Sequence, residues 1–224
     1  MPQLGVIFDW DGVVINSANL HEESWQVLAD EINHVLPINH FKNGFGKRNE
    51  TIIGNILKWS DNSDEIIKWG IRKEEIYREL ANQQMIKMVP GTKEILDLLK
   101  KNKVPTAIGT STEKKNVALA IKQNQLDEFF TGAIYSEDVS KGKPHPEVFL
   151  KAAKTIGCYP ENCIVFEDST HGIEAAIRAR MNPVGITTTN TKSRLLEKGA
   201  KIVVDRLDEI DLSILEDLIK SAKE

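Results

Sequence analysis

Residues 5–12 read GVIFDWDG. The first four of these residues form a short apolar run, which is typical of a strand buried on both faces of a parallel sheet. The run ends directly in two carboxylates, Asp9 and Asp11, and Gly12 follows them. In open α/β sheets, ligands bind beyond the carboxyl ends of the strands. This stretch therefore predicts a core strand with a polar site at its end.

Similar short apolar runs recur along the chain and alternate with amphipathic helical patterns. The later strands are predicted over residues 106–109, 133–135, 163–166, 183–186 and 201–204. Between them, residues 93–101 and 148–156 place their apolar side chains on one face of a helix. Strands that alternate with helices predict an α/β protein with a doubly wound parallel sheet and right-handed crossovers.

One long interval breaks this alternation. Helices alone are predicted there, over residues 20–35, 50–58, 64–69 and 72–88. A crossover between parallel strands needs only a dozen or more residues, so an interval of about seventy residues predicts an inserted domain. We expect a Rossmann-like core formed by residues 1–17 and 90–224 and an all-helical cap formed by residues 18–89.

The composition is that of an ordinary globular protein. The chain has 224 residues, of which 41% are hydrophobic and 28% charged, and its formal net charge is -4. This charge gives no general attraction to nucleic acids or anionic membranes. No apolar run approaches the roughly 18 residues of a membrane-spanning helix, and the chain starts without a signal-peptide pattern. We expect a cytoplasmic monomer, with Cys158 and Cys163 reduced and buried.

Polar side chains follow several of the predicted strands. They are Asp9 and Asp11 after the first strand, Thr110 and Ser111 after the second, Lys143 in the loop before the fourth, and Glu167 and Asp168 after the fourth. Carboxylate oxygens bind Mg²⁺, whereas lysine and hydroxyl groups contact phosphoryl oxygens. The set therefore predicts a site for a phosphoryl group that is held with the help of a hard cation.

A carboxylate that attacks a phosphate ester brings like charges together. At about 4 Å, each pair of unit charges repels by about 4 kcal/mol at an effective dielectric constant near 20. A divalent metal bound by Asp9 and Asp168, together with the Lys143 ammonium, would offset this repulsion. The sequence thus predicts phosphoryl chemistry that depends on Mg²⁺.

Four stretches match a known set of motifs. They are DWDGVV at residues 9–14, Thr110 at the end of a strand, GKPHPEVF at residues 142–149 and EDSTHGI at residues 167–173. In this order and at strand ends, they resemble the motifs of the haloacid dehalogenase superfamily, in its branch of small phosphatases and β-phosphoglucomutase-like proteins with a helical cap. The resemblance covers essentially the whole chain and implies an enzyme that acts on phosphate monoesters.

The resemblance implies a role for each core residue. Asp9 would attack phosphorus and form an aspartyl-phosphate, and Asp11 would protonate the leaving oxygen and later take a proton from the incoming water or hydroxyl group. Thr110 and Lys143 would hold the transferring phosphoryl group. Members of the superfamily that cleave carbon–phosphorus or carbon–halogen bonds lack the second acid, so Asp11 favours phosphate esters.

The resemblance also implies the magnesium ligands. These would be the Asp9 carboxylate, the Asp11 backbone carbonyl and Asp168, with Glu167 binding directly or through water. Taken singly, the same residue types have ordinary structural roles. Asp168 and Thr110 could be helix N-caps, and Glu167 could be a surface acid. Only the joint pattern favours a catalytic site.

The predicted cap offers further candidates for substrate binding. His21 lies where the mutases of the superfamily carry a histidine that faces the substrate, although a helical histidine is also common as an exposed or hydrogen-bonded residue. Residues 44–49, GFGKRN, resemble the glycine-rich cap loop in which an arginine grips a distal phosphate or sugar. Arg48 is the candidate for this substrate contact, and Lys47 is the alternative. Without a functional role, the same residues would form a solvated basic turn. Ser111 is a candidate from the core.

Two functions share the formation of the aspartyl-phosphate. Attack by water gives a phosphatase, and attack by a bound sugar phosphate gives a mutase. The mutases carry a Ser-Lys-Asn run after the second motif, whereas this chain has Glu113 where a basic residue is expected. We therefore expect a phosphatase of small, sugar-phosphate-like metabolites, with a mutase as the alternative. A non-hydrolytic phospho-aspartate switch is a remote third, because receiver domains lack a helical insertion after the first strand.

Overall fold

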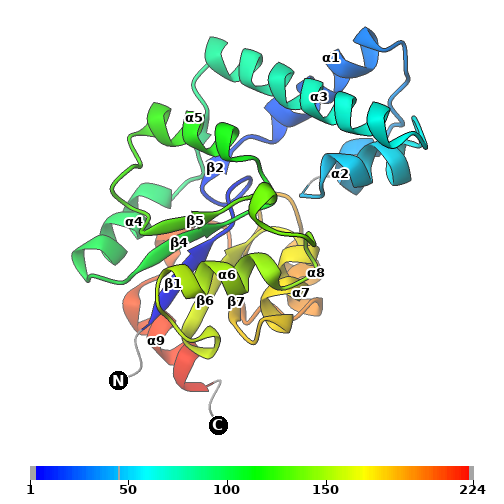
Figure 1. Cartoon of the computed structure of the whole chain (residues 1–224). Coiled ribbons are helices and arrows are strands. Elements are labelled where there is room, and N and C mark those ends of the chain that lie inside the picture. Colours follow the sequence, from blue (N-terminus) through cyan, green and yellow to red (C-terminus); the bar gives the residue numbers. More distant parts are fainter. Residues whose placement is uncertain (1–3, 45, 222–224) are drawn as a thin grey trace.

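A six-stranded parallel sheet forms the centre of the larger part of the molecule (Figure 1). The structure is a computed structural model and describes residues 4–44 and 46–221; Phe45, in the predicted cap loop, lies outside the described residues. In spatial order the strands are β5 (Gly132–Ile134), β4 (Thr106–Gly109), β1 (Gly5–Phe8), β6 (Cys163–Glu167), β7 (Asn182–Ile186) and β8 (Ile202–Val204). The predicted doubly wound sheet is confirmed.

Helices cover both faces of this sheet. They are α4 (Thr92–Lys101), α5 (Lys114–Asn124) and α9 (Leu212–Ser221) on one face, and α6 (Glu147–Thr155), α7 (Thr170–Arg178) and α8 (Lys192–Glu197) on the other. The side chains of β1 alternate between the faces, as the strand pleat requires. Val6 and Phe8 pack with α4, α5 and α9, whereas Ile7 packs with Phe149 of α6. This explains why the central strands are apolar throughout.

The strand order changes direction at β1. After β1 the chain forms β4 and β5 on one side, and it then returns to form β6, β7 and β8 on the other. Such a reversal opens a crevice at the carboxyl ends of the central strands, where α/β proteins bind their ligands. Asp9 follows β1 at this point, and Glu167 ends β6 beside it.

The helices between β2 (Ile15–Asn16) and β3 (Lys87–Met88) form a separate group away from the sheet (Figure 1). They are α1 (Ala18–Glu31), α2 (His40–Gly44), the π-helical segment η1 (Thr51–Leu57) and α3 (Ser63–Gln83). The group has its own apolar core, in which Trp25 and Leu28 of α1 pack with Ile53 and Ile76. The predicted helical cap is therefore present.

Several details of the cap differ from the prediction, and helix α2 was not predicted. The helices expected over 64–69 and 72–88 are one helix, α3, which continues through Gly70 but ends at Gln83, before β3. A Cβ atom at Gly70 would lie 3.3 Å from that of Asn49, so the glycine allows close packing rather than a break. In addition, β2 and β3 pair antiparallel where the chain enters and leaves the cap. Each has two residues, too few for a sequence pattern to reveal.

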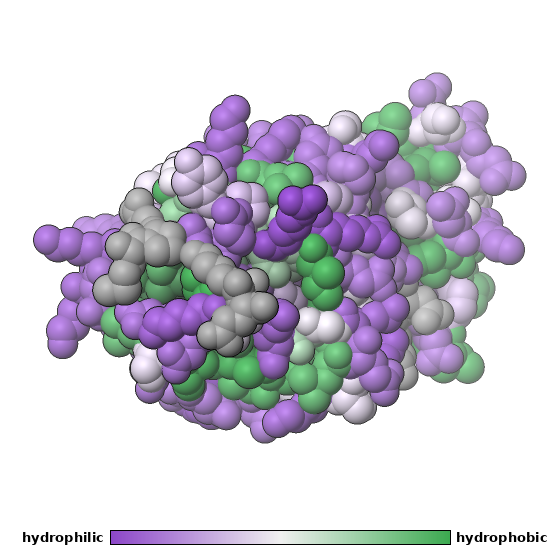
Figure 2. Space-filling view, turned by 90° about the horizontal axis from the view of Figure 1, so that it is seen from below, coloured by the Kyte–Doolittle hydropathy of each residue, from purple (hydrophilic) through white to green (hydrophobic). Residues whose placement is uncertain are grey.

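The surface mixes polar and apolar residues. At the end of the core that lies away from the cap, hydrophilic residues are interspersed with hydrophobic ones (Figure 2). Within residues 4–44 and 46–221, every helix is too short or too polar to cross a membrane. Cys158 and Cys163 are buried free thiols, as expected. Burial raises the pKa of Cys163 to about 12, so this thiol is unreactive.

Candidate active site

The predicted core residues meet at the carboxyl ends of β1, β4 and β6. A cavity of about 370 Å³ opens there between the core and the cap. Of the predicted site residues, those that line it are Asp9, Asp11, His21, Lys47, Arg48, Thr110, Ser111 and Asp168. Lys143 and Glu167 lie behind Asp9, with side chains that are 2% and 0% exposed. The structure therefore brings together all the residues that the sequence singled out.

Lys143 lies between two buried carboxylates. Its Nζ atom is 2.9 Å from Asp9 Oδ2 and 2.6 Å from Glu167 Oε1. Burial opposes the charged form of this lysine, but Asp9 and Glu167 hold its pKa above the usual value. Burial raises the pKa of Asp9 to about 7; the Lys143 charge opposes this increase and Glu167 adds to it. Three buried carboxylates, including Asp168, thus share a single ammonium.

The donor set fits a divalent hard cation. Asp9, Glu167 and Asp168 can each present one oxygen such that these atoms lie within 4.8 Å of one another. Asp9 Oδ1 is buried and has no hydrogen-bond partner among the described residues. Burial, together with Glu167 and Asp9, holds the pKa of Asp168 well above its ordinary value. A cation with oxygen preference, such as Mg²⁺, would relieve this repulsion and satisfy Asp9 Oδ1.

Two glycines let the backbone approach these acids. Gly12 has φ +79°, and a Cβ atom there would lie 2.1 Å from Asp168 Oδ2. A Cβ atom at Gly172 would lie 1.7 Å from Glu167 Oε1. Any side chain at either position would displace the carboxylate beside it. The close approach of these carboxylates therefore explains why glycine is required at both positions, in the first and fourth motifs.

Two threonines that the sequence did not single out contact the acidic site: Thr189 orients Asp168, and Thr188 binds the Gly12 carbonyl. Thr189 Oγ1 donates to Asp168 Oδ2 at 2.5 Å, and Thr188 Oγ1 donates to the Gly12 carbonyl at 2.6 Å. Both follow β7, so the rule that polar residues after a strand reach the site could have found them. The N-cap of α7 is Ser169, which accepts from the Gly172 amide. The alternative interpretation of Asp168, as a helix N-cap without a catalytic role, is therefore wrong.

Asp11 is held by hydrogen bonds from both parts of the molecule. Ser17 Oγ and Thr112 Oγ1 donate short hydrogen bonds to its carboxylate, and His21 Nε2 lies 3.3 Å from Oδ1. Burial acts to raise the pKa of Asp11, but His21 and the donated hydrogen bonds lower it to about 2. Asp11 is therefore a carboxylate in this arrangement, which is the form that accepts a proton.

A buried ion pair in α3 supports His21. Lys73 Nζ lies 2.7 Å from His21 Nδ1 and 2.9 Å from Glu74 Oε1, and both side chains of the pair are almost fully buried. Glu74 also accepts hydrogen bonds from Asn49 of the cap and Asn116 of the core. This pair could not be predicted from the sequence, because adjacent charged residues in an amphipathic helix are usually solvent-exposed.

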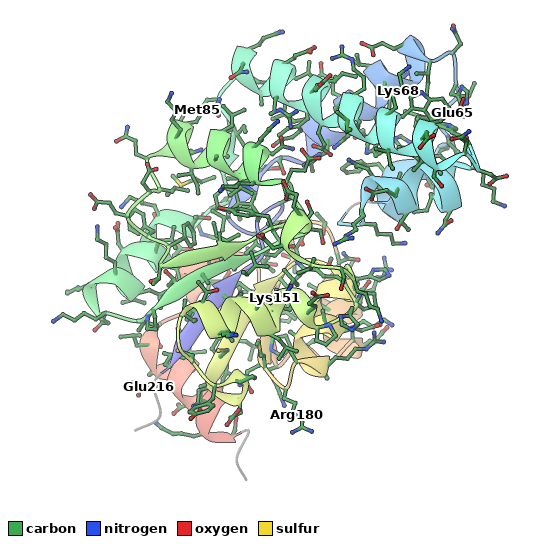
Figure 3. The ribbon with its side chains drawn as sticks, in the orientation of Figure 1. Glu65, Lys68, Met85, Lys151, Arg180 and Glu216 are labelled. Carbon is green, nitrogen blue, oxygen red and sulfur yellow. The ribbon has the colours of Figure 1, made fainter. Side chains whose placement is uncertain are left out.

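We expect Lys73→Met to lower the free energy of unfolding by about 3–5 kcal/mol, because it leaves the buried Glu74 carboxylate without its cation. Urea denaturation would measure this loss. The matched control is Lys68→Met, on the exposed face of the same helix (Figure 3), where we expect a change within about 0.5 kcal/mol. Equal values for the two variants would contradict a structural role for the Lys73–Glu74 pair.

The cap loop contributes Lys47 and Arg48 to the cavity wall. Arg48 Nη2 donates to the backbone carbonyls of Ser136 and Val139 in the core, at 2.9 and 2.5 Å. On another wall, Glu113 lies 3.3 Å from Arg78 of α3. Both arginines therefore join the cap to the core beside the cavity.

The fold and the site together define an α/β protein with a helical cap and an acidic site where the strand order reverses. The model of the family of haloacid dehalogenase-like hydrolases matches residues 6–186. The chain belongs to this family. The superfamily and the enzyme class expected from the four motifs are therefore confirmed.

Similar proteins carry phosphatase names. The chain is 35% identical over 218 residues to the chloroplastic 5-amino-6-(5-phospho-D-ribitylamino)uracil phosphatase of Arabidopsis thaliana, and the match covers 96% of the chain but 57% of that relative. It is 26% identical to a phosphorylated carbohydrates phosphatase of Thermotoga maritima, and the match covers 96% of the chain and 99% of that relative. The crystal structure of a HAD hydrolase of Entamoeba histolytica, family IA, variant 3, is also similar, with 33% sequence identity and a TM-score of 0.88. The match covers 97% of the chain and 100% of that structure.

Proposed function

We propose that the chain is a Mg²⁺-dependent phosphatase that hydrolyses small phosphorylated metabolites through an aspartyl-phosphate on Asp9. One observation carries the proposal: Asp9 lines the cavity beside the Lys143 ammonium and two further buried acids, and its buried Oδ1 has no hydrogen-bond partner among the described residues. The relatives named as phosphatases of a ribityl phosphate and of phosphorylated carbohydrates support the substrate class.

Asp9 and Asp11 divide the chemistry. In the first step, an Asp9 oxygen bonds to phosphorus as the ester P–O bond breaks, and the leaving oxygen takes a proton from Asp11. Asp11 is a carboxylate in the structure without substrate, so it must take up this proton before the first step. In the second step, water bonds to phosphorus, the bond from Asp9 to phosphorus breaks, and Asp11 takes the proton of the water. Inorganic phosphate then leaves, Asp9 is a carboxylate again, and Asp11 keeps the proton of the water for the next leaving group.

Lys143 and Thr110 would bind the oxygens of the transferring group. The Thr110 hydroxyl accepts the Thr112 amide at 3.1 Å, which leaves its own hydrogen for a phosphoryl oxygen. Mg²⁺, when bound, would supply positive charge at these oxygens. We propose that Asp9, Asp168 and the Asp11 carbonyl hold it, with Glu167 binding directly or through water.

We also propose that residues 18–89 act as the cap over a core of residues 1–17 and 90–224. A cap over the cavity would exclude bulk water during the first step. His21, Lys47, Arg48 and Ser111 line the cavity and are proposed to contact the organic part of the substrate. The cytoplasmic location, the monomeric state and the lack of nucleic-acid and membrane partners stay predictions.

Glu113 favours water over a sugar phosphate as the acceptor. This carboxylate lines the cavity at the position where a mutase needs a basic residue. A carboxylate there gives no attraction to the second phosphate of a bisphosphate intermediate. We therefore retain the mutase only as an outcome of the test below.

Phosphate release from a panel of esters would test this function. The panel includes p-nitrophenyl phosphate, sugar phosphates, polyol phosphates and β-glucose 1-phosphate with its bisphosphate. We expect free phosphate from several monophosphates, because Asp9 and Lys143 bind the phosphoryl group itself. Glucose 6-phosphate without free phosphate would indicate a mutase, and a single turnover would indicate a phospho-aspartate switch.

Removal of the metal should stop turnover. We expect excess EDTA to lower kcat by at least about 100-fold and added Mg²⁺ to restore it, because one ammonium cannot offset three buried carboxylates and a phosphate. Initial rates on p-nitrophenyl phosphate, before and after dialysis, provide the measurement. Full activity in the dialysed protein with EDTA present would contradict the metal requirement.

A further inference from the structure

The segment that precedes the phosphoryl-binding lysine is anchored from the core. We call residues 136–143 the lysine segment. Glu147, at the start of α6, accepts a hydrogen bond from the Lys141 amide at 3.1 Å. One turn along the same helix, Lys151 donates to the Asp138 carbonyl at 2.6 Å (Figure 3). Helix α6 of the core thus fixes the lysine segment through two side chains.

The cap holds the same segment from the other side, through Arg48. Its Nη2 atom donates to the carbonyls of Ser136 and Val139. Its side chain also lies close to the backbone of Gly142, because a Cβ atom added there would be 3.3 Å from Arg48 Nε and 3.5 Å from Cδ. A single cap side chain therefore spans the lysine segment from its first residue to the residue before Lys143.

The position of Lys143 matters more than that of most loop residues. Its Nζ atom lies between Asp9 and Glu167, at 2.9 and 2.6 Å, and its side chain is 2% exposed. Displacements near 1 Å in catalytic groups can lower rates by about 100-fold. A contact that fixes the backbone one residue away therefore bears directly on the phosphoryl site.

We propose that Arg48 is a positioning residue: by binding the lysine segment from the cap, it sets the place of the Lys143 ammonium beside Asp9. The proposal rests on the proposed phosphatase function. It gives Arg48 a role for every substrate, including one with no distal group for the cap to bind. The cap then helps to assemble the phosphoryl site as well as to cover it.

Steady-state kinetics of Arg48→Ala on two substrates would test this role. We expect kcat to fall by about 10- to 100-fold on both p-nitrophenyl phosphate and a sugar phosphate, with KM changed less than about threefold. An arginine that only binds the distal part of a substrate would instead raise KM for the sugar phosphate alone. A wild-type kcat of Arg48→Ala on p-nitrophenyl phosphate would overturn the proposal.

Gly142→Ala tests the same contact without removing a charge. The added methyl group would lie 3.3 Å from Arg48 Nε, so the Arg48 side chain would have to shift by a few tenths of an ångström, and we expect a smaller fall in kcat than in Arg48→Ala. The matched control is Arg78→Ala, which removes the other cap arginine that reaches the core, through Glu113 and Asn116 of the α5 region. We expect its kcat on p-nitrophenyl phosphate to stay within about threefold of wild type. Equal losses in Arg48→Ala and Arg78→Ala would mean general loosening of the cap and would overturn the proposal.

Hydrogen–deuterium exchange gives a second measurement that needs no catalysis. We expect faster exchange over residues 136–143 in Arg48→Ala and wild-type exchange there in Arg78→Ala. Unchanged exchange in Arg48→Ala would contradict the proposal, whatever the activity. If wild-type protein hydrolyses no phosphate ester while the exchange result holds, the proposed function fails and the positioning contact stands.

Discussion

We expect Asp9→Asn to lower kcat on every phosphate ester by at least about 10⁴-fold. An amide has nearly the shape of the carboxylate but does not attack phosphorus, so no acyl-phosphate forms. The substitution also removes one of three buried carboxylates that share the Lys143 ammonium. For this reason, the metal-free variant should unfold at a temperature no lower than that of the wild-type protein.

Kinetics and thermal unfolding of the same preparations would check this expectation. The matched control is Asp127→Asn, which makes the same change at an exposed position of the core and should keep wild-type kcat. Activity of Asp9→Asn within tenfold of wild type would remove Asp9 as the nucleophile. A variant that does not fold would be inactive whatever the role of Asp9. The unfolding curve of Asp9→Asn identifies this case.

We expect Asp11→Asn to separate the two half-reactions. With p-nitrophenyl phosphate, the leaving group departs without protonation, so Asp9 can still be phosphorylated. The second step needs a base to take the proton of water, and the amide cannot serve as one. Steady-state kcat should therefore fall by about 10²- to 10⁴-fold, while the phosphorylated enzyme accumulates.

Stopped-flow detection of p-nitrophenolate would show this as a burst of about one product per enzyme, followed by slow turnover. Thr112→Val is the matched control, because it removes one hydroxyl donor to Asp11 and keeps the carboxylate. We expect a smaller loss of kcat and no burst in that variant. Wild-type turnover by Asp11→Asn would contradict the role of Asp11 as the base.

The core and its acids could be predicted from the sequence for a physical reason. A strand buried on both faces must be apolar throughout, so the run before Asp9 stands out from the helical patterns around it. Polar residues that directly follow such runs lie at the edge of the sheet where the parallel strands end together. This placed Thr110 and Asp168 beside Asp9, and the same rule applied after β7 would have added Thr189.

The cap was harder to predict, because its decisive contacts lie between elements. Lys73 and Glu74 look like exposed charges of α3, and only the packing of α3 on α1 and the core shows that they are buried beneath His21. Arg48 binds the backbone carbonyls of Ser136 and Val139. Every residue type has such a carbonyl, so the identities of these two residues do not predict the contact. Side-chain chemistry can be inferred from a sequence, whereas a backbone partner far along the chain cannot.

Chemical trapping of the phosphorylated residue tests the central claim most directly. Asp11→Asn is mixed with p-nitrophenyl phosphate and Mg²⁺, quenched in acid and treated with borohydride, which reduces an acyl-phosphate to an alcohol. We predict that mass spectrometry of the digested protein finds homoserine in place of Asp9 and an unaltered peptide in the absence of substrate. Turnover with no altered residue, or with the alteration at another carboxylate, would contradict the account.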